Sequence, residues 1–140
     1  MGEDMIAVRL ADQDDLGAVS HSHLSQDQIL QKIKLEEIYL LLVNDRPVGS
    51  LWIGFLWDFV PFIDLIIIDA AYQKRGLSHH LLGFVEADLR GRGYDVLYSS
   101  SQIDEPIPQA WHRHVGFEEC GVINGLNEGG IGEVFFRKSI

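Results

Sequence analysis

The sequence is poor in cysteine, proline and basic residues. Its 140 residues contain one cysteine and four prolines, and 11 Lys and Arg stand against 21 Asp and Glu, a formal net charge of −10. A single cysteine, Cys120, excludes an internal disulfide framework and suits a reducing compartment, so we expect a cytoplasmic protein. The acidic balance argues against general nucleic-acid binding, which requires a basic surface.

Long hydrophobic runs are also missing. The most apolar stretch, residues 59–71, is interrupted by Pro61, Asp64 and Asp69, which argues against a membrane-spanning helix and a membrane partner. The acidic start, MGEDMIAVRL, is unlike a signal peptide. The length suits a single domain over residues 1–140, with no internal repeat or interdomain linker.

What is present is an alternation of strand and helix patterns that predicts a mixed α/β fold with one sheet covered by helices. Ser25 and Gln28 form a capping-box pattern that predicts the start of a helix ending near Leu35. Further helices are expected at 12–23, 77–91 and 109–115. Strands are expected at 5–10, 39–43, 48–57, 62–69, 94–99, 117–123 and 132–138. Trp52, Phe55 and Trp57 are expected to pack within the sheet.

The chain is organised around residues 62–91. An apolar run, FIDLIIID, predicts a buried strand, and HHLLGFVEADLRG predicts an amphipathic helix. The short turn between them contains Gly76, with Gln73, Lys74 and Arg75 before it. A glycine turn that leads into a helix presents unpaired backbone N–H groups and the positive end of the helix dipole. This stretch therefore predicts a site for a phosphate-bearing ligand.

The segment Gln73-Lys74-Arg75-Gly76-Leu77-Ser78 resembles the diphosphate-binding signature of the GNAT superfamily of N-acyltransferases, with Ser78 where that family has Gly or Ala. The resemblance implies a mostly antiparallel sheet of six or seven strands with about four helices. It also implies an enzyme that uses acetyl-CoA to acetylate a primary amine by direct attack. The implied cofactor contacts are Ile66, Ile67 and Ile68 beside the thioester arm, and Gln73, Lys74, Arg75, Gly76, Leu77, Ser78 and His79 around the diphosphate.

A second local match, Trp111 to Phe117, resembles the segment that ends the family's fourth helix, with His112 in place of the usual tyrosine. In the family that tyrosine is often the general acid toward the leaving thiolate. An imidazolium is able to do the same, but His112 is equally compatible with helix packing and with no acid role. Asp64 shares a strand face with Ile66 and Ile68. It is a candidate general base, or a carboxylate at a strand edge.

The sequence also bears on an alternative function, on metal binding and on the acceptor. The missing tyrosine leaves open a non-catalytic acyl-CoA-binding or regulatory module. His21 and His23, and the pair His79 and His80, lack the spacing of a metal site, so no metal is expected. The resemblance implies that His21 or His23 borders the acceptor pocket. The acceptor amine is not identified by the sequence, and a homodimer is left open.

Overall fold

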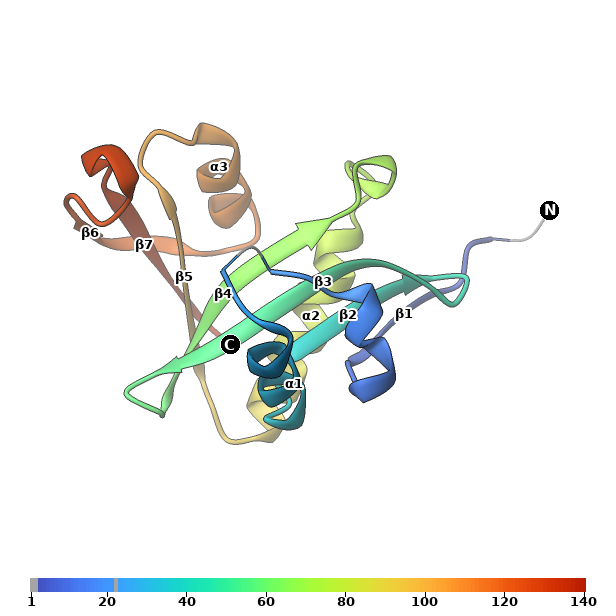
Figure 1. Ribbon diagram of the computed structural model, residues 1–140. Helices are drawn as coiled ribbons and strands as arrows, with labels where there is room; N and C mark the ends of the chain where they lie inside the picture. Colours follow the sequence, from blue (N-terminus) through green and yellow to red (C-terminus); the bar gives the residue numbers. More distant parts are fainter. Residues whose placement is uncertain (1–2, 22) are drawn as a thin grey trace. The chain divides into compact units, whose positions relative to one another are not determined.

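The computed structural model describes residues 3–21 and 23–140 (Figure 1). The strands of this part are β1 (Ile6–Leu10), β2 (Ile38–Val43), β3 (Arg46–Leu56), β4 (Val60–Ile68), β5 (Val96–Gln102), β6 (Glu118–Ile123) and β7 (Glu133–Ser139). Its α-helices are α1 (Gln26–Lys34), α2 (Leu77–Gly91) and α3 (Pro106–His114). Its 3-10 helices are η1 (Gln13–Ala18), η2 (Ala70–Tyr72) and η3 (Glu128–Gly130).

The seven strands are ordered β1-β2-β3-β4-β5-β7-β6. The pairs β1–β2, β2–β3, β5–β7 and β7–β6 are antiparallel, and β4 pairs with β5 in parallel through Phe62 and Tyr98. The predicted mixed α/β class and mostly antiparallel sheet are confirmed. No helix in the described part of the chain is both long and apolar enough to cross a bilayer.

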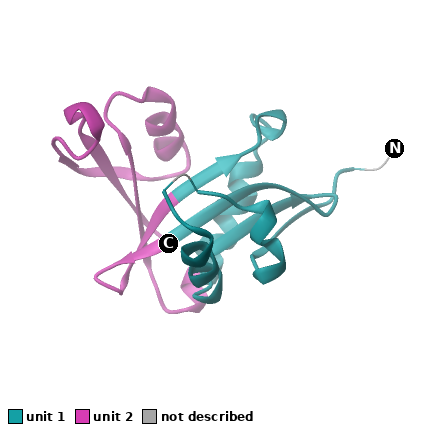
Figure 2. Ribbon diagram, in the orientation of Figure 1, with its two compact units in different colours: residues 1–53, 65–88 teal, residues 54–64, 89–140 magenta. Residues whose placement is uncertain are grey.

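The chain divides into two compact units, shown in Figure 2. Unit 1 contains residues 1–53 and 65–88, and unit 2 contains residues 54–64 and 89–140. Strands β3 and β4 and helix α2 each begin in one unit and end in the other. The two units are described separately below.

Unit 1 has its core on both faces of β2. All six residues of this strand are buried, because β1 and β3 flank it and helices cover it. One face packs against side chains of η1 and α1 in a cluster that includes Leu40, Ile29 and Ile33. On the other face the Tyr39 hydroxyl donates a 2.6 Å hydrogen bond to Asp88 Oδ2 of α2. The sheet of unit 1 is therefore sandwiched between α1 and α2.

Polar side chains fix the helix starts in unit 1. The predicted capping box is confirmed: the Gln28 N–H donates to Ser25 Oγ at 3.2 Å, and the Ser25 N–H donates to Gln28 Oε1 at 2.8 Å. Asp12 and Asp15 form a second capping box at η1. Arg9 donates two hydrogen bonds to the Asp15 carboxylate, at 2.7 and 3.0 Å, which lowers the pKa of Asp15. The Ser25 box was predictable because its signal needs only two residues three apart, whereas the Asp12 box was not predicted.

Unit 2 is built on β5, β7 and β6, joined by the first half of β4. Burial alternates strictly along β5, so Leu97, Ser99 and Ser101 are buried and the residues between them are half-buried. Helix α3 covers the buried face, where its His112 stacks on Phe136 of β7. Pro106 stands at the first position of α3, where its missing N–H is no loss.

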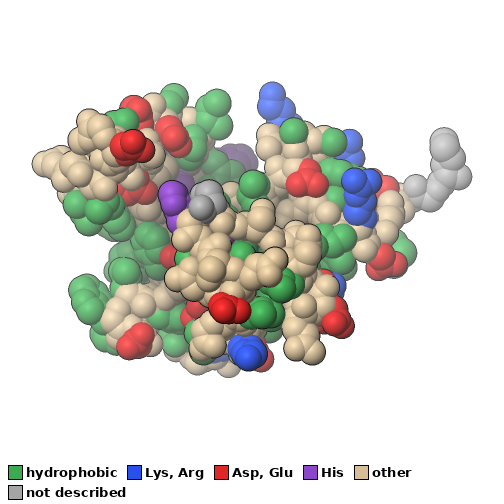
Figure 3. Space-filling model, in the orientation of Figure 1, with side chains coloured by type: hydrophobic (Ala, Val, Ile, Leu, Met, Phe, Trp, Pro, Cys, Tyr) green, Lys and Arg blue, Asp and Glu red, His purple; other side chains and the backbone are tan. Residues whose placement is uncertain are grey.

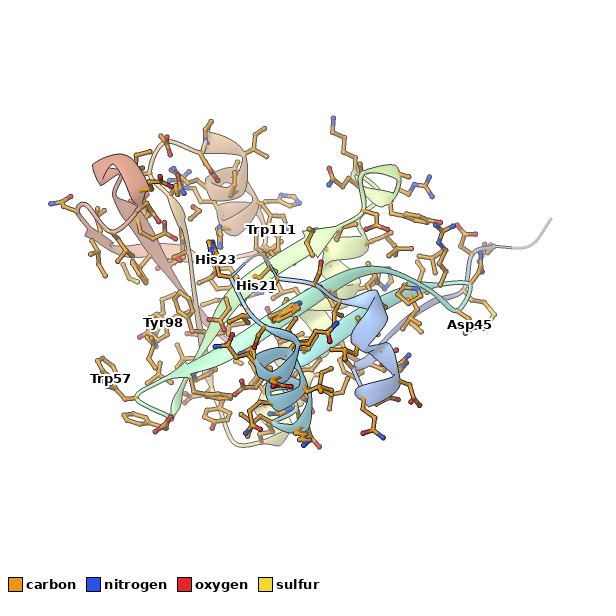
Figure 4. All side chains as sticks on the ribbon, viewed as in Figure 1. His21, His23, Asp45, Trp57, Tyr98 and Trp111 are labelled. Atoms are coloured by element: carbon orange, nitrogen blue, oxygen red, sulfur yellow. The ribbon has the colours of Figure 1, made fainter. Side chains whose placement is uncertain are left out.

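Three sequence predictions were wrong in detail. The helix expected at 12–23 is the 3-10 helix η1, which ends at Ala18. Helix α3 begins at Pro106 rather than at residue 109, because proline is well suited to a first turn. Trp57 does not pack in the sheet. It stands at the tip of the β3–β4 turn with a φ of 53°, is 79% exposed, and projects from the hairpin (Figure 4).

Ser101 provides a test of packing in unit 2. The side chain is 7% exposed, and its hydroxyl has no hydrogen-bond partner among the described residues. An unsatisfied buried hydroxyl costs about 1–3 kcal/mol, so Ser101→Ala is expected to stabilise the protein by about 1 kcal/mol in urea unfolding. Ser99→Ala, on the same face, is the control and should destabilise, because Ser99 is bonded to His112. A loss of stability in Ser101→Ala would contradict the prediction.

Candidate functional site

The predicted phosphate loop lies wholly in unit 1, between the end of β4 and the start of α2. The Asp69 N–H, just after β4, donates to Val48 O of β3 at 2.8 Å, which holds the strand end in place. Gly49 permits this approach, because a Cβ there would lie 2.8 Å from Ile67 O. Ile66 and Ile68 are half-buried and Ile67 is exposed. The three isoleucines thus lead directly into the loop.

Backbone conformation makes the loop turn sharply. Lys74 and Gly76 both have left-handed φ angles, 61° and 73°. A Cβ built at position 76 would have nothing within 4 Å, so a lack of space does not explain the glycine. The left-handed φ explains it, because glycine adopts this conformation without strain. The Gln73 side chain donates a 2.8 Å hydrogen bond from Nε2 to Ile68 O, which ties the loop back to the strand. Gln73 therefore acts as a brace for the loop.

The loop presents backbone donors at the N-terminus of a 15-residue helix. Within the described residues, no acceptor takes the N–H groups of Lys74, Arg75, Gly76 and Leu77. His79 differs, because its N–H donates to Gly76 O at 3.2 Å. Leu77 is buried and anchors the start of the helix, whereas residues 73–76 are exposed. Consecutive donors of this kind, at the positive end of a helix dipole, form an anion-binding site.

Positive side chains reinforce the loop in an acidic protein. Lys74 and Arg75 are both exposed, and the Arg75 guanidinium lies over the Tyr72 ring at 5.2 Å. In the space-filling view, several separate basic side chains lie on the part of the surface that unit 1 forms, with acidic side chains between them (Figure 3). This charge and the unpaired N–H groups together favour a ligand with more than one phosphate oxygen.

Asp64, the candidate base, lies in unit 2 on the first part of β4. Asp64 is exposed, and its carboxylate lies directly over Gly54 of β3. A Cβ on Gly54 would be 2.8 Å from Asp64 Oδ2, so glycine leaves the room that this carboxylate occupies. Glycine at position 54 thus lets the Asp64 carboxylate lie over β3, and the role of Asp64 as a base stays a prediction.

His112, the candidate acid, lies in unit 2 and is buried, with 3% of its surface exposed. Nδ1 lies 2.7 Å from Pro108 O and Nε2 lies 2.7 Å from Ser99 Oγ. A carbonyl oxygen only accepts, so Nδ1 carries the proton, and Nε2 of the neutral ring accepts from the Ser99 hydroxyl. Phe136 stacks on the ring at 4.4 Å, and Phe117 meets it edge-on at 5.4 Å.

Burial lowers the pKa of His112 below its usual value of 6.5. The hydrogen bond to Pro108 and the charge of Glu133 act in the opposite direction, and the charge of Arg113 adds to the lowering. The imidazole is therefore neutral at pH 7 and both of its nitrogens are engaged. These contacts are those of a residue that holds α3 on the sheet, and the catalytic role of His112 stays a prediction.

The lowered pKa of His112 predicts a loss of stability in mild acid. Below about pH 6.5 the unfolded chain binds a proton at this residue that the folded protein resists. As the pH is lowered below about 6.5, the unfolding free energy should therefore decrease, by up to about 1.4 kcal/mol per pH unit from this group. Urea unfolding at about pH 5 and about pH 7 would show it. His112→Gln should flatten the dependence in this range, and an equally steep profile in that variant would refute the assignment.

His21 and His23 lie in the segment between η1 and α1 of unit 1 (Figure 4). The His23 N–H donates to His21 Nδ1 at 3.0 Å, and the His21 ring lies 5.4 Å from the ring of Trp52. Across residues 3–21 and 23–140, no three His, Cys, Asp or Glu side chains gather as a set of metal ligands. The expected position of His21 or His23 beside the acceptor pocket stays a prediction.

A mostly antiparallel sheet whose fourth strand leads into a glycine loop and a long helix defines an α/β domain with a candidate anion site at that loop. The family model described as "Acetyltransferase (GNAT) family" matches residues 7–117. The chain belongs to this family. Among curated proteins, none matches the sequence.

Solved structures of low sequence identity share the fold. The ribosomal-protein-S18-alanine N-acetyltransferase from Escherichia coli is 18% identical, with a TM-score of 0.79 over 97% of this chain and 94% of that one. Ard1 from Thermoplasma volcanium is 13% identical, with a TM-score of 0.83 over 96% and 97%. A GNAT family acetyltransferase from Elizabethkingia anophelis, solved with acetyl-CoA bound, is 16% identical, with a TM-score of 0.75 over 96% and 98%.

Two residues that shape these sites were missed by the sequence analysis. Ser99 fixes the orientation of His112, and Gly54 makes room for Asp64. Each of the two acts on a residue of another element. Gln73 was expected beside the diphosphate, whereas its hydrogen bond to Ile68 O was not expected. Only the alternation of serines on β5 carried a signal, since it indicates which serines share a face.

Proposed function

We propose that this protein is an acetyl-CoA-dependent N-acetyltransferase that acts on a primary amine by direct attack. The observation that carries the proposal is the loop of unit 1, where Lys74, Arg75, Gly76 and Leu77 present unpaired N–H groups at the start of α2. Membership of the GNAT family and the acetyl-CoA complex of the Elizabethkingia anophelis structure support the choice of ligand.

The residues present fit coenzyme A at this loop. The N–H groups and the Lys74 and Arg75 charges would hold the diphosphate, with Gln73, Ser78 and His79 beside them. Ile66, Ile67 and Ile68 would run beside the thioester arm. Acetyl-CoA supplies the thioester carbonyl that an amine attacks, and coenzyme A leaves as the thiol.

Asp64 is the proposed base. The attacking nitrogen must lose a proton as it bonds to the carbonyl carbon, and an exposed carboxylate is suited to accept that proton. His112 is the weaker candidate for the acid, because it must first gain a proton that burial opposes. Departure of a thiolate does not strictly need that proton, so Asp64 alone is sufficient for the chemistry.

Thiol release with a panel of primary amines tests this function. Wild-type protein should release coenzyme A in an amine-dependent reaction, and Asp64→Asn should lower kcat by about 10²-fold or more. Asp58→Asn, which removes an exposed carboxylate from the same β3–β4 hairpin, is the matched control and should leave kcat unchanged. Equal rates for Asp64→Asn and wild type would remove Asp64 from the mechanism.

A second function is favoured by the contacts of His112. At the place of the family's usual tyrosine stands a buried neutral ring with both nitrogens engaged, as in a protein that binds acyl-CoA without transferring the acyl group. Calorimetric binding of coenzyme A without turnover on any amine would favour this module. Amine-dependent turnover would exclude it, and absence of coenzyme A binding would exclude both functions.

A further inference from the structure

The sheet of unit 2 has a second face, opposite the one that α3 covers. Because side chains alternate along a strand, Tyr98 and Ser100 of β5 point away from buried Ser99 and its partner His112. On β7, Phe135 likewise alternates with buried Phe136. Residues of this second face are half-buried rather than buried, so it keeps a surface that a ligand is able to contact.

Three aromatic side chains form the floor of this face, which we name the aromatic face: Phe62, Tyr98 and Phe135. Phe62 of β4 is in register with Tyr98 of β5, and Ser100 is in register with Phe135 of β7. The rings of Phe62 and Phe135 lie 5.8 Å apart, so they meet across β5. Figure 4 locates Tyr98 on that strand. Ring faces of this kind accept an apolar body or a cation.

The carboxylate of Glu133, beside the aromatic face, is fixed by two hydrogen bonds. Glu133 Oε2 accepts a 2.6 Å hydrogen bond from the Ser100 hydroxyl, and Oε1 accepts a 2.9 Å hydrogen bond from Asn127 Nδ2. Both donors are neutral, and no Lys or Arg of the described residues forms an ion pair with Glu133. A half-buried carboxylate that is fixed in place but lacks a cation is complementary to an ammonium ion.

Other charges on this side of the sheet favour the same ligand. Asp64 lies two residues beyond Phe62 on β4, so its carboxylate is on the same face as the ring. Arg137 is the opposing charge, since it is in register with Tyr98, but its residue is exposed and it donates to Ser139 Oγ at 3.4 Å. The part of the aromatic face around Phe62 and Phe135 is therefore apolar, and the charges beside it, Asp64 and Glu133, are negative.

We infer that the aromatic face and Glu133 bind the acceptor, and that the acceptor is a primary ammonium on an aromatic or aliphatic body without a carboxylate. The inference rests on the proposed acetyltransferase function, whose acceptor it specifies. The rings contact the carbon body, and Glu133 pairs with the ammonium group. An amino acid is disfavoured, because its own carboxylate would approach Glu133 and Asp64.

NMR titration with three small probes tests the inference without relying on turnover. Phenethylamine carries both expected features, phenylalanine adds a carboxylate, and phenethyl alcohol lacks the charge. Phenethylamine should bind at least about tenfold more tightly than either of the others, the factor that one charge-assisted hydrogen bond supplies. Glu133→Gln and Phe135→Ala should each weaken it about tenfold and remove the preference. Thermal unfolding of each variant shows that it is folded.

Glu128→Gln is the matched control, since it removes an exposed carboxylate from η3 of the same unit and should leave binding unchanged. Equal affinity for phenethylamine and phenylalanine, absence of phenethylamine binding, or equal binding by Glu133→Gln would each overturn the inference. Calorimetry with coenzyme A separates the two proposals. If the protein binds coenzyme A and acetylates only amines that lack an apolar body, the acetyltransferase proposal stands and the acceptor inference fails. If the protein does not bind coenzyme A, the acetyltransferase proposal fails, whatever the result with phenethylamine.

Discussion

Gly76→Glu is expected to weaken coenzyme A binding at least about hundredfold, because two effects act together. The backbone at position 76 has a φ of 73°, which costs a residue with a side chain about 1–2 kcal/mol and turns the loop N–H groups away. The new carboxylate also stands where phosphate is expected, and the two negative charges repel each other. Calorimetric titration of coenzyme A into the folded variant measures the loss.

Gly83→Glu is the matched control for this experiment. It makes the same substitution on the same helix, at an exposed glycine with nothing within 4 Å of a new Cβ and without a left-handed φ. Glutamate is a better helix former than glycine by roughly 0.5–1 kcal/mol, so this variant should bind coenzyme A normally and unfold later. Equal affinities of the two variants for coenzyme A would place the phosphate site elsewhere.

His112→Ala is expected to lower the unfolding free energy by about 3 kcal/mol. The substitution removes a ring that stacks on Phe136 at 4.4 Å, leaves a cavity between α3 and the sheet, and strips Ser99 Oγ of its partner. Urea unfolding at about pH 7 measures this cost, because the imidazole is neutral there in both states. The control is Ile107→Ala on the same helix, at a side chain that is 82% exposed, which should change stability by less than about 0.5 kcal/mol.

A further substitution, His112→Phe, separates support of the fold from catalysis. If His112 only holds α3 in place, His112→Phe should keep kcat per folded molecule near the wild-type value while stability falls. If the imidazole donates the proton to the thiolate, kcat should fall by about 10²-fold or more and the acid side of its pH profile should move. A normal stability in His112→Ala would contradict the contacts described for this ring.

The loop of unit 1 was predictable because its signals are local. A run of isoleucines, a glycine, two basic residues and a helical pattern follow one another within about thirty residues, and each depends only on near neighbours. The capping box at Ser25 was predictable for the same reason. Gly76 shows the strength of such signals, since its left-handed φ is what a glycine between a strand and a helix indicates.

Features that depend on distant partners were not predictable. The burial of His112 depends on Ser99 and Phe136, and nothing in the WHRHVGF segment indicates what lies beneath the helix. Trp57 shows the opposite error, since its size suggested the core, whereas the two-residue turn places it and Asp58 at positive φ in the solvent. Large side chains are usually buried, and a turn at the end of two long strands overrides that tendency.

The division of the chain into two units bears on how such a protein can diversify. All of unit 1, with its phosphate loop, lies within the first 88 residues, and the only part of unit 2 there is the hairpin 54–64. Everything after residue 88 belongs to unit 2, including the aromatic face strands β5 and β7. A single crossover near this boundary would therefore exchange most of one unit and leave the other intact. Recombinant chimeras joined there would inherit the loop from one parent and most of the aromatic face from another.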